Sequence, residues 1–166
     1  VVWRRQGQIP DTLLLVEHPP VFTIGRGGGW ENLRCSQKTL EQEGIQVYEV
    51  NRGGNITYHG PGQLVGYPII DLTNQGRDVR GYLRNLEEIL IRTLQPYLEP
   101  LGLKPERLPD YTGVWVANAK IAAIGVAVKR WVTMHGFALN LNTNLQHFQL
   151  INPCGLNKPV TSLYSL

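Results

Sequence analysis

Three apolar segments, separated only by short breaks, limit most strongly what this chain can fold into. They are residues 113–117 (GVWVA), 120–128 (KIAAIGVAV) and 131–142 (WVTMHGFALNLN). Each is short enough for a strand, and the break at Ala117-Asn118-Ala119 has residues that suit a tight turn. The pattern predicts an antiparallel meander.

Further strands are expected upstream, at residues 12–17, 21–24, 46–50 and 64–72. The first two are separated by His18-Pro19-Pro20, and proline cannot donate a hydrogen bond to a strand ladder. A short helix is expected over residues 36–43, with Ser36 as its cap and Gly44 as its stop.

The longest helix is predicted to begin after Asp78, a good N-cap residue. Pro96 is expected to kink or end it. Its apolar residues recur at spacings of three and four: Leu83, Leu86, Ile89, Leu90, Leu94 and Leu98. Strands dominate, and strict alternation of strand and helix is absent. The chain is therefore expected to be an α+β domain with a mixed or antiparallel sheet flanked by helices.

Length and composition favour a single globular domain over residues 1–166. Of the 166 residues, 42% are hydrophobic and 17% charged, and no repeat or linker divides them. The start without Met and the end at Tyr164-Ser165-Leu166 lead us to expect a chain trimmed at both ends. No apolar run approaches the length of a membrane span, and no signal-peptide pattern is present. Two thiols without such a signal favour the reducing cytoplasm.

The charge balance is mildly basic, with a net charge of +3 and a pI of about 9.0, which favours acidic partners. Basic residues lie scattered, with Arg4-Arg5 and Lys129-Arg130 as the pairs, and no nucleic-acid motif is present. We therefore expect an acidic protein and not a nucleic acid. No cysteine or histidine spacing predicts a structural metal.

Residues 52–62 (RGGNITYHGPG) are the most unusual stretch, because four glycines and a proline leave no room for a regular element. Such a loop can merely turn the chain. Glycines also let a backbone approach a ligand closely, and this loop carries Arg52, Tyr58 and His59. It is not a phosphate-binding loop of the Gly-Lys-Ser/Thr kind. A second glycine cluster, residues 25–30, is expected to be a mobile loop bordering a site.

Cys154 is the candidate nucleophile. It stands between Pro153 and Gly155, a setting for a turn that can present the sulfur and free backbone N–H groups as oxyanion donors. The alternative is an inert buried thiol. Cys35 precedes an ordinary short helix and is discounted.

An ordinary thiol is only about 3% ionised at pH 7, so Cys154 needs a helper. His18, His59 and His135 could each serve as a base. Lys120 opens an apolar strand, where most lysines simply reach for water. A cation within about 4–6 Å of a thiol can nevertheless lower its pKa by one to three units.

Four motifs in this order closely resemble the lipoyl(octanoyl) transferase family: RGGNITYHGPGQLVGYPI, KIAAIGVAV, HGFALNLN and NPCGL. IPDTLLLVEHPPVFTIGR resembles the N-terminal strands of the same family. The resemblance implies a fold related to the catalytic domain of biotin and lipoate protein ligases. It also implies an acyltransferase that moves an octanoyl group from octanoyl-acyl carrier protein to a lysine of a lipoyl domain, the first step of endogenous protein lipoylation.

The acceptors implied are the lipoyl domains of 2-oxoacid dehydrogenases and the glycine-cleavage H protein, and no cofactor is needed. The resemblance places the acyl-thioester cysteine at Cys154 and the lysine that lowers its pKa at Lys120. His135 is a possible supporting residue. The substrate-contacting positions implied are Arg52, Gly53, Gly54, Asn55, Ile56, Thr57, Tyr58, His59, Ala123, Ile124, Gly125, Gly136, Phe137 and Ala138.

The chemistry expected is ping-pong acyl transfer without ATP, with Ile124 and Phe137 lining an acyl channel. The main alternative is an ATP-dependent lipoate or biotin protein ligase, which needs a lysine in a similar segment but not Cys154. A second alternative is a non-catalytic acyl-binding or nucleic-acid-binding module.

Overall fold

The computed structural model describes residues 1–152 and 158–166. Its larger sheet has six strands in the order β1 (Thr12–Val16), β5 (Gln63–Ile69), β9 (Val132–Asn140), β8 (Ala119–Lys129), β7 (Tyr111–Val116) and β6 (Glu106–Leu108). All neighbours in it are antiparallel. The predicted meander is therefore confirmed as β7, β8 and β9.

Two tight turns connect the strands of the meander. Ala117 and Asn118 have positive φ values of 47° and 66°, and Arg130 and Trp131 have values of 52° and 67°. Two successive residues with positive φ twist a hairpin turn in the same sense as its strands. Trp131 therefore belongs to the turn, and the expectation that it begins the third strand was wrong by one residue.

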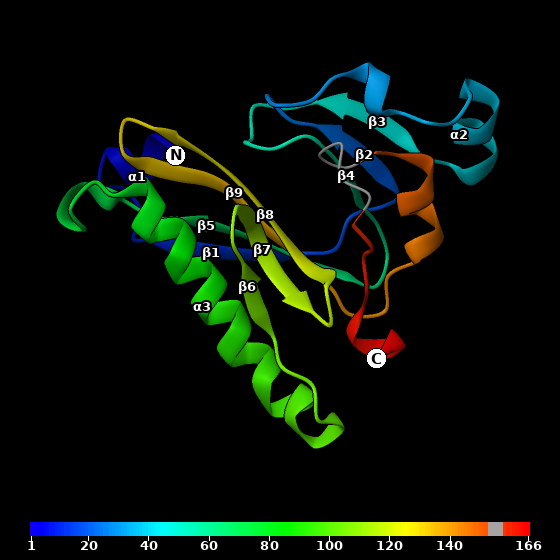
Figure 1. Cartoon of the computed structure of the whole chain (residues 1–166). Helices are drawn as coiled ribbons and strands as arrows, with labels where there is room; N and C mark the ends of the chain where they lie inside the picture. Colours follow the sequence, from blue (N-terminus) through cyan, green and yellow to red (C-terminus); the bar gives the residue numbers. More distant parts are fainter. Residues whose placement is uncertain (153–157) are drawn as a thin grey trace.

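A smaller sheet has three strands, in the order β3 (Gln46–Glu49), β2 (Val21–Ile24) and β4 (Ile56–His59). The β2–β3 pair is parallel and the β2–β4 pair antiparallel, so this sheet is mixed. The break at His18-Pro19-Pro20 is where the chain passes from the larger sheet to the smaller one (Figure 1).

Strand β4 corrects the expectation that residues 52–62 hold no regular element. Ile56 and Tyr58 are each 1% exposed, whereas Thr57 between them is only half-buried. This alternation with period two is a strand signal. Its four residues are too few to stand out among the flanking glycines.

The two predicted helices are confirmed with their caps. In α2 (Gln37–Glu43), the Ser36 hydroxyl accepts a hydrogen bond from the Thr39 N–H, and Gly44 ends the helix in the left-handed conformation. In α3 (Val79–Leu98), the Asp78 carboxylate accepts from the Gly81 N–H. The helix runs two residues past Pro96 before it ends.

Helix α3 packs against β7 and β8 along one stripe of its surface (Figure 1). Leu90, Leu94 and Leu98 are buried there with Val114 and Ile121. Each fully buried leucine contributes about 1.5–3 kcal/mol. Ile89, expected on the same stripe, is 57% exposed. The buried row Leu86, Leu90, Leu94 and Leu98 follows spacing four and drifts one way round the helix. Ile89 lies about 60° from Leu86 and about 100° from Leu90 on the opposite side of that row, which leaves it facing outward.

Strand β5 ends at Ile69, three residues before the predicted end. Asp71 then caps a 3-10 turn, η2 (Leu72–Asn74), by accepting a hydrogen bond from the Thr73 N–H. Leu72 is 1% exposed and packs with Tyr82 and Leu86 of α3. Leu72 therefore keeps the buried environment that its sequence predicts, but in a turn.

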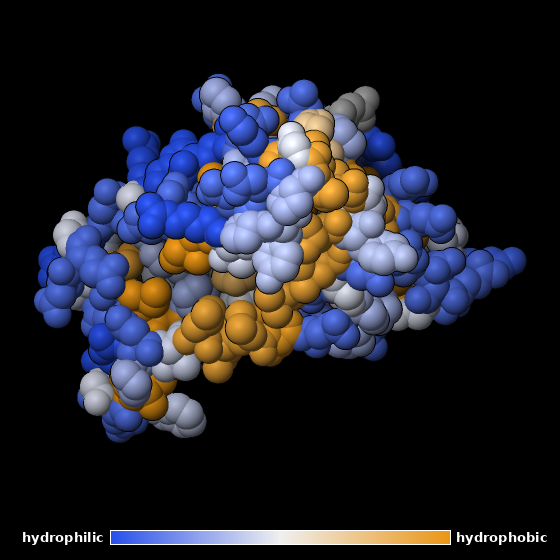
Figure 2. All heavy atoms as spheres, turned by 90° about the horizontal axis from the view of Figure 1, so that it is seen from below, coloured by the Kyte–Doolittle hydropathy of each residue, from blue (hydrophilic) through white to orange (hydrophobic). Residues whose placement is uncertain are grey.

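The chain also forms a short helix, α1 (Val2–Arg5), and 3-10 turns η1 (Trp30–Asn32), η3 (Glu99–Leu101), η4 (Leu145–Leu150) and η6 (Leu163–Ser165). Strand β1 is an edge of the larger sheet, and its Leu13 and Leu15 are more than half exposed. Figure 2 shows a band of apolar side chains across the face that it views. Within the described residues, no helix is long and apolar enough to cross a membrane. Sheets and helices together make the α+β fold that the sequence predicts.

Candidate active site

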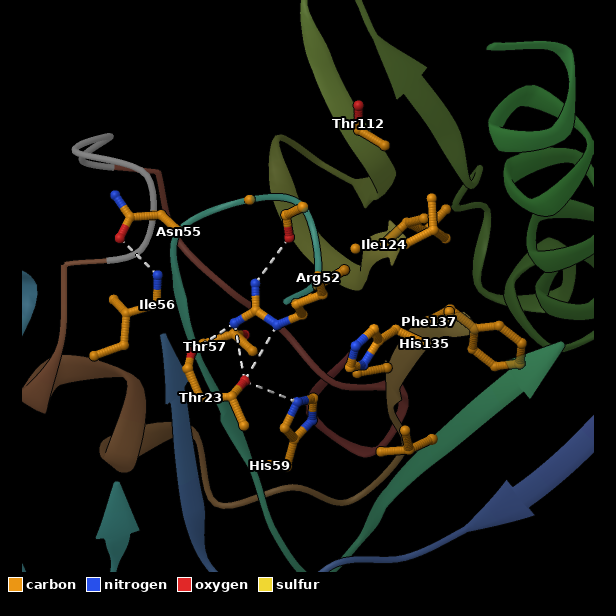
Figure 3. Close-up of a pocket in the computed structure, with 18 of the residues that line it drawn as sticks. Thr23, Arg52, Asn55, Ile56, Thr57, His59, Thr112, Ile124, His135 and Phe137 are labelled. Carbon is orange, nitrogen blue, oxygen red and sulfur yellow. Dashed lines mark hydrogen bonds between the residues drawn. The ribbon is translucent and has the colours of Figure 1, made fainter. Parts of the chain in front are cut away.

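A cavity of about 820 Å³ opens between the two sheets. Its walls come from β2, from residues 52–57, from the middle of β8 and from β9 (Figure 3). Of the fourteen substrate-contacting positions expected from the resemblance, thirteen line it. Tyr58 is the exception, because its ring packs into the core of the smaller sheet against Phe22 and Phe148.

Arg52 anchors the glycine-rich segment at the cavity wall. Its guanidinium donates to the backbone carbonyl of Thr23 at 2.5 Å, to Thr23 Oγ1 at 2.9 Å and to the Gly53 carbonyl at 3.0 Å (Figure 3). The side chain is buried, so these hydrogen bonds replace water that the cation has lost. The segment is thereby tied to β2.

The second glycine cluster lies behind this segment. Gly25, Arg26 and Gly27 donate backbone hydrogen bonds to the carbonyls of Asn55, Arg52 and Gly54, at 3.0–3.2 Å. A Cβ at Gly25 would overlap the Gly54 carbonyl, so only glycine allows this close approach. Residues 25–27 thus support residues 52–55 from outside and are not among the residues that line the cavity.

Small residues form the part of the cavity floor that faces Arg52. A Cβ on Gly125 would meet the Gly53 carbonyl oxygen at 2.8 Å and Arg52 Cδ at 3.2 Å. Alternation along the strands puts Ala123 on the same face as Gly125, and register pairs these two with Ala138 and Gly136 of β9. The sheet is bare of large side chains here, and a flat apolar chain could lie on it.

Ile124 and Phe137 also line the cavity, but their side chains pack toward α3. Ile124 joins the clusters built on Leu90 and Leu86, and the Phe137 ring lies against the Cα of Gly66. They support the floor from beneath as well as bordering the space.

His59 is buried at the end of β4. Its Nδ1 lies 2.8 Å from Gln63 Oε1, and its Nε2 lies 3.4 Å from Thr23 Oγ1. Burial, together with the positive charge of Arg52, lowers the pKa of His59 to about 4. His59 is therefore neutral at pH 7.

The other two candidate bases, His18 and His135, also face the cavity. His18 Nε2 lies 2.7 Å from the Tyr67 hydroxyl. His135 lies 2.6 Å from Asn51 Oδ1 and has a positive φ of 58°, which is unusual in a strand. Burial and then Arg52 lower the pKa of His135.

Lys120 lies at the start of β8 and lines the cavity. Its ammonium is 4.8 Å from the centre of the Trp115 ring, and the ammonium of Lys158 is 6.0 Å from the same centre. The Lys120 N–H donates to the Pro159 carbonyl at 2.9 Å, and Thr161 N–H donates to the Lys120 carbonyl at 3.0 Å. The strand that carries Lys120 is therefore hydrogen-bonded to residues 159–161.

Cys154 lies outside the described residues. The described residues on its two sides are Asn152, whose N–H donates to the Asn32 carbonyl at 2.7 Å, and Lys158, which lines the cavity. Cys35 is half-buried, and burial raises the pKa of its thiol.

Several residues of the site were not predicted from the sequence. Trp115, Thr23, Gln63 and Asn140 all line the cavity, yet none was singled out. Gln63 and Asn140 belong to motifs that carried the resemblance. Their buried polar side chains on strands were the signal that could have found them.

The sequence and the fold have counterparts among known proteins. The family described as the lipoyl protein ligase A/B catalytic domain matches residues 1–166. This chain belongs to that family. The resemblance to the lipoyl(octanoyl) transferases is confirmed as well, since many relatives about half identical over nearly the whole chain carry the name octanoyltransferase.

Two relatives illustrate how close the match is. The octanoyltransferase of Solibacter usitatus is 56% identical over 163 residues, which are 98% of this chain and 72% of the relative. That of Caldicellulosiruptor saccharolyticus is 54% identical over 164 residues, or 98% of this chain and 69% of the relative.

Solved structures of lipoate protein ligases share the fold. Lipoate-protein ligase A bound with ATP has a TM-score of 0.71 at 19% identity, covering 93% of this chain and 64% of that one. An archaeal bipartite lipoate protein ligase from Thermoplasma acidophilum has a TM-score of 0.60 at 18% identity, covering 90% of this chain and 57% of that one. The expected relation to ligase catalytic domains is thus confirmed.

Proposed function

We propose that this chain is an octanoyltransferase that moves an octanoyl group from a carrier thioester to a protein lysine through a thioester on Cys154. The relatives named octanoyltransferase, at 54–56% identity over nearly the whole chain, are the observation that carries the proposal. The presence of Cys154 in the chain agrees with it, because ATP-dependent ligation needs no such nucleophile.

Lys120 is proposed as the cation that favours the thiolate form of Cys154. It borders the cavity, and its strand is hydrogen-bonded to residues 159–161, which follow Cys154 closely in sequence. His59 is a weaker candidate for a base, since its pKa of about 4 makes it a poor proton acceptor at neutral pH.

The acyl chain is proposed to lie on the bare floor formed by Ala123, Gly125, Gly136 and Ala138. Burial of each methylene contributes about 0.8 kcal/mol, so an eight-carbon chain gains several kcal/mol there. The segment from Arg52 to Thr57 would close over it, and Arg52 would hold that segment in place through Thr23.

The two half-reactions balance without a cofactor. The Cys154 thiolate attacks the donor carbonyl, the C–S bond to the carrier breaks, and the carrier thiolate leaves and takes up a proton. The acceptor lysine, as a neutral amine, then attacks the new thioester, and the Cys154 thiolate leaves as an amide forms. Lys120 is proposed to give its proton to the departing carrier thiolate in the first half-reaction. As a neutral amine it would then take the proton that the acceptor amine loses in the second, which restores the cation beside the Cys154 thiolate.

The donor proposed is octanoyl-acyl carrier protein, and the acceptors are lipoyl domains of 2-oxoacid dehydrogenases and the glycine-cleavage H protein. A net charge of +3 favours encounter with an acidic carrier. Residues 1–166 would act as one catalytic domain in the cytoplasm.

The experiment that tests this function is octanoyl transfer to an apo lipoyl domain, followed by the mass of the acceptor. With octanoyl carrier protein as donor, the acceptor should gain one octanoyl group without added nucleotide. If transfer requires ATP and Mg²⁺, with free octanoate as substrate, the chain is a ligase instead.

A further inference from the structure

A chain of buried polar groups connects the cavity to the strand that carries Lys120. Its side-chain members are His59, Gln63 and Asn140, all less than 10% exposed. They come from β4, β5 and β9, so the chain crosses from the smaller sheet into the larger one. Polar side chains this deeply buried are costly unless every member is satisfied.

The direction of the hydrogen bonds follows from the contact between Asn140 and Thr161, where only one atom can be the donor. Asn140 Nδ2 donates to the Thr161 carbonyl at 2.9 Å, because a carbonyl can only accept. Asn140 Oδ1 therefore points the other way and accepts from Gln63 Nε2 at 2.9 Å. The same Gln63 nitrogen donates to the Tyr58 carbonyl at 3.1 Å, which fixes the orientation of the amide a second time.

The orientation of Gln63 fixes the tautomer of His59. Gln63 Oε1 can only accept, so His59 Nδ1, at 2.8 Å, must carry the proton. His59 Nε2 is then unprotonated, and its lone pair faces Thr23 Oγ1 at 3.4 Å. Thr23 Oγ1 accepts from Arg52, which leaves its own proton to point at His59. Every donor from Arg52 to Thr161 therefore points the same way.

The far end of this chain meets the backbone of Lys120. Thr161, which receives the Asn140 amide, donates its own N–H to the Lys120 carbonyl at 3.0 Å, and Val160 forms a parallel bridge with Lys120. Residues 159–161 are thus held between Lys120 on one side and Asn140 on the other. These residues directly follow Lys158, and the first of them, Pro159, is five positions after Cys154 in the sequence.

We propose that Gln63 and Asn140 are positioning residues of the acyl-transfer site, which fix residues 159–161 against Lys120 and so fix the downstream anchor of the segment that carries Cys154. The inference rests on the proposed function for the roles of Cys154 and Lys120. It assigns His59 to the same chain, as a neutral donor to Gln63 and not as a base.

Asn140→Ala in a Cys35→Ala background tests the anchor. The rate of Cys154 alkylation by iodoacetamide is measured against pH, beside the melting temperature. If the anchor sets the distance from Lys120 to the thiol, the midpoint of the alkylation profile should rise by about one pH unit. Alkylation should then fall about 5–10-fold at pH 7 and recover at pH 9. A lower melting temperature with an unchanged midpoint would reduce Asn140 to a structural role and overturn the proposal.

The matched control is Asn74→Ala, since Asn74 is exposed in η2 and far from the chain of hydrogen bonds. It should change neither the midpoint nor the rate at pH 7. An equal shift in this control would also count against the proposal.

Gln63→Glu gives a second, independent test, which can be used if Asn140→Ala fails to fold. The new carboxylate would face His59 Nδ1–H and raise the His59 pKa, against the opposing charges of Arg52, His18 and His135. NMR titration of the His59 ring should show this rise, and the alkylation midpoint should rise with it, because the donor to Asn140 is lost. An unchanged His59 titration would show that the hydrogen bonds do not run as assigned.

Acylation of wild-type protein by octanoyl carrier protein distinguishes a failure of the proposed function from a failure of the positioning role. If wild-type protein gains no octanoyl group from octanoyl carrier protein but the alkylation midpoint still shifts in Asn140→Ala, the positioning role stands and the acyl-transfer role falls. If wild-type protein is acylated and the midpoint stays fixed, only the positioning role falls.

Discussion

Lys120 and Trp115 are register partners on β8 and β7, and the ammonium of Lys120 lies 4.8 Å from the centre of the Trp115 ring. Trp115 is only 1% exposed, so the surrounding protein covers its ring almost completely. A cation over an indole face gains about 0.5–2 kcal/mol, more where water is excluded. The ring thus helps to hold a charged group at the cavity wall.

Replacing Trp115 should therefore affect both stability and acyl transfer. Trp115→Leu is expected to lower the free energy of unfolding by about 3 kcal/mol, because a large buried side chain is lost. Acyl-enzyme formation at pH 7 should fall about 3–10-fold beyond any loss of folded protein. The reason is that Lys120 loses a cation–π contact that orients its ammonium and contributes about 0.5–1.5 kcal/mol. Trp115→Phe, which keeps an aromatic face, should lose less.

Urea unfolding and single-turnover acylation measure the two effects. Trp3→Leu is the control, because Trp3 is 65% exposed and lies on α1. If Trp115→Phe and Trp115→Leu acylate at equal rates, the aromatic face does not contribute to holding Lys120.

Lys120→Met should return the Cys154 thiol toward its ordinary pKa of about 8.5. A thiol with a pKa near 6.5 is about three-quarters ionised at pH 7, against about 3% for an ordinary one, so alkylation should fall about 25-fold. The acylation step should recover substantially at pH 9. Deacylation by the acceptor lysine should remain slow, because the proton shuttle, worth about 10²–10⁴-fold, is missing.

The pH profile of Cys154 alkylation with iodoacetamide decides this. Identical profiles with and without Lys120 would mean that the lysine does not set the ionisation of the thiol. His135 would then be the first alternative, because it lines the same cavity and is less deeply buried than His59.

Gly125→Ala should block the floor of the cavity. Its Cβ would meet the Gly53 carbonyl oxygen at 2.8 Å, so the segment above must move or the added methyl must fill the acyl space. We expect acylation by octanoyl donors to fall at least about 10-fold, with a loss of about 1–3 kcal/mol in stability.

Gly44→Ala separates these two effects. Gly44 has a positive φ of 64° with open space around it, so alanine costs about 1 kcal/mol in strain far from the cavity. It should leave acylation of the folded protein unchanged. If both variants lose activity in proportion to stability, Gly125 has no special place in the acyl site.

The sequence predicts the helices and strands of this molecule better than the contacts within its candidate site. The meander, the Ser36 and Asp78 caps and the α3 stripe are local patterns, and the structure confirms them. The hydrogen-bonded connection from His59 to Lys120 is not local. It joins positions 23, 52, 59, 63, 140 and 161, which only the packing of two sheets brings together, so no local pattern predicts their contacts. Strand β4 was missed for a different reason. Its alternation with period two is a local signal, but it covers only four residues beside a longer glycine-rich pattern.

Stability should depend on His59 as the pH is lowered. Its folded pKa of about 4 lies below the ordinary value of 6.5, so the unfolded chain binds a proton more readily between those two values. The free energy of unfolding should be fully retained above pH 6.5 and should fall as the pH drops toward 4, by about 3 kcal/mol in all from this one group. His135, whose pKa is also lowered, adds a loss of the same sign.

Urea unfolding of wild-type protein and His59→Gln across pH 4–7 measures this dependence. The variant should be less stable at pH 7 but should lose less stability as the pH falls. Parallel curves for the two proteins would mean that His59 is not kept neutral by its burial.

The most direct measurement of the central claim is the intact mass of the protein after incubation with octanoyl carrier protein and no nucleotide. Wild-type protein and Cys35→Ala should each gain the mass of one octanoyl group, which hydroxylamine removes and which passes to an apo lipoyl domain when one is added. Cys154→Ala should gain none. An adduct that persists in Cys154→Ala, or one that forms only with ATP and Mg²⁺, would contradict acyl transfer through Cys154.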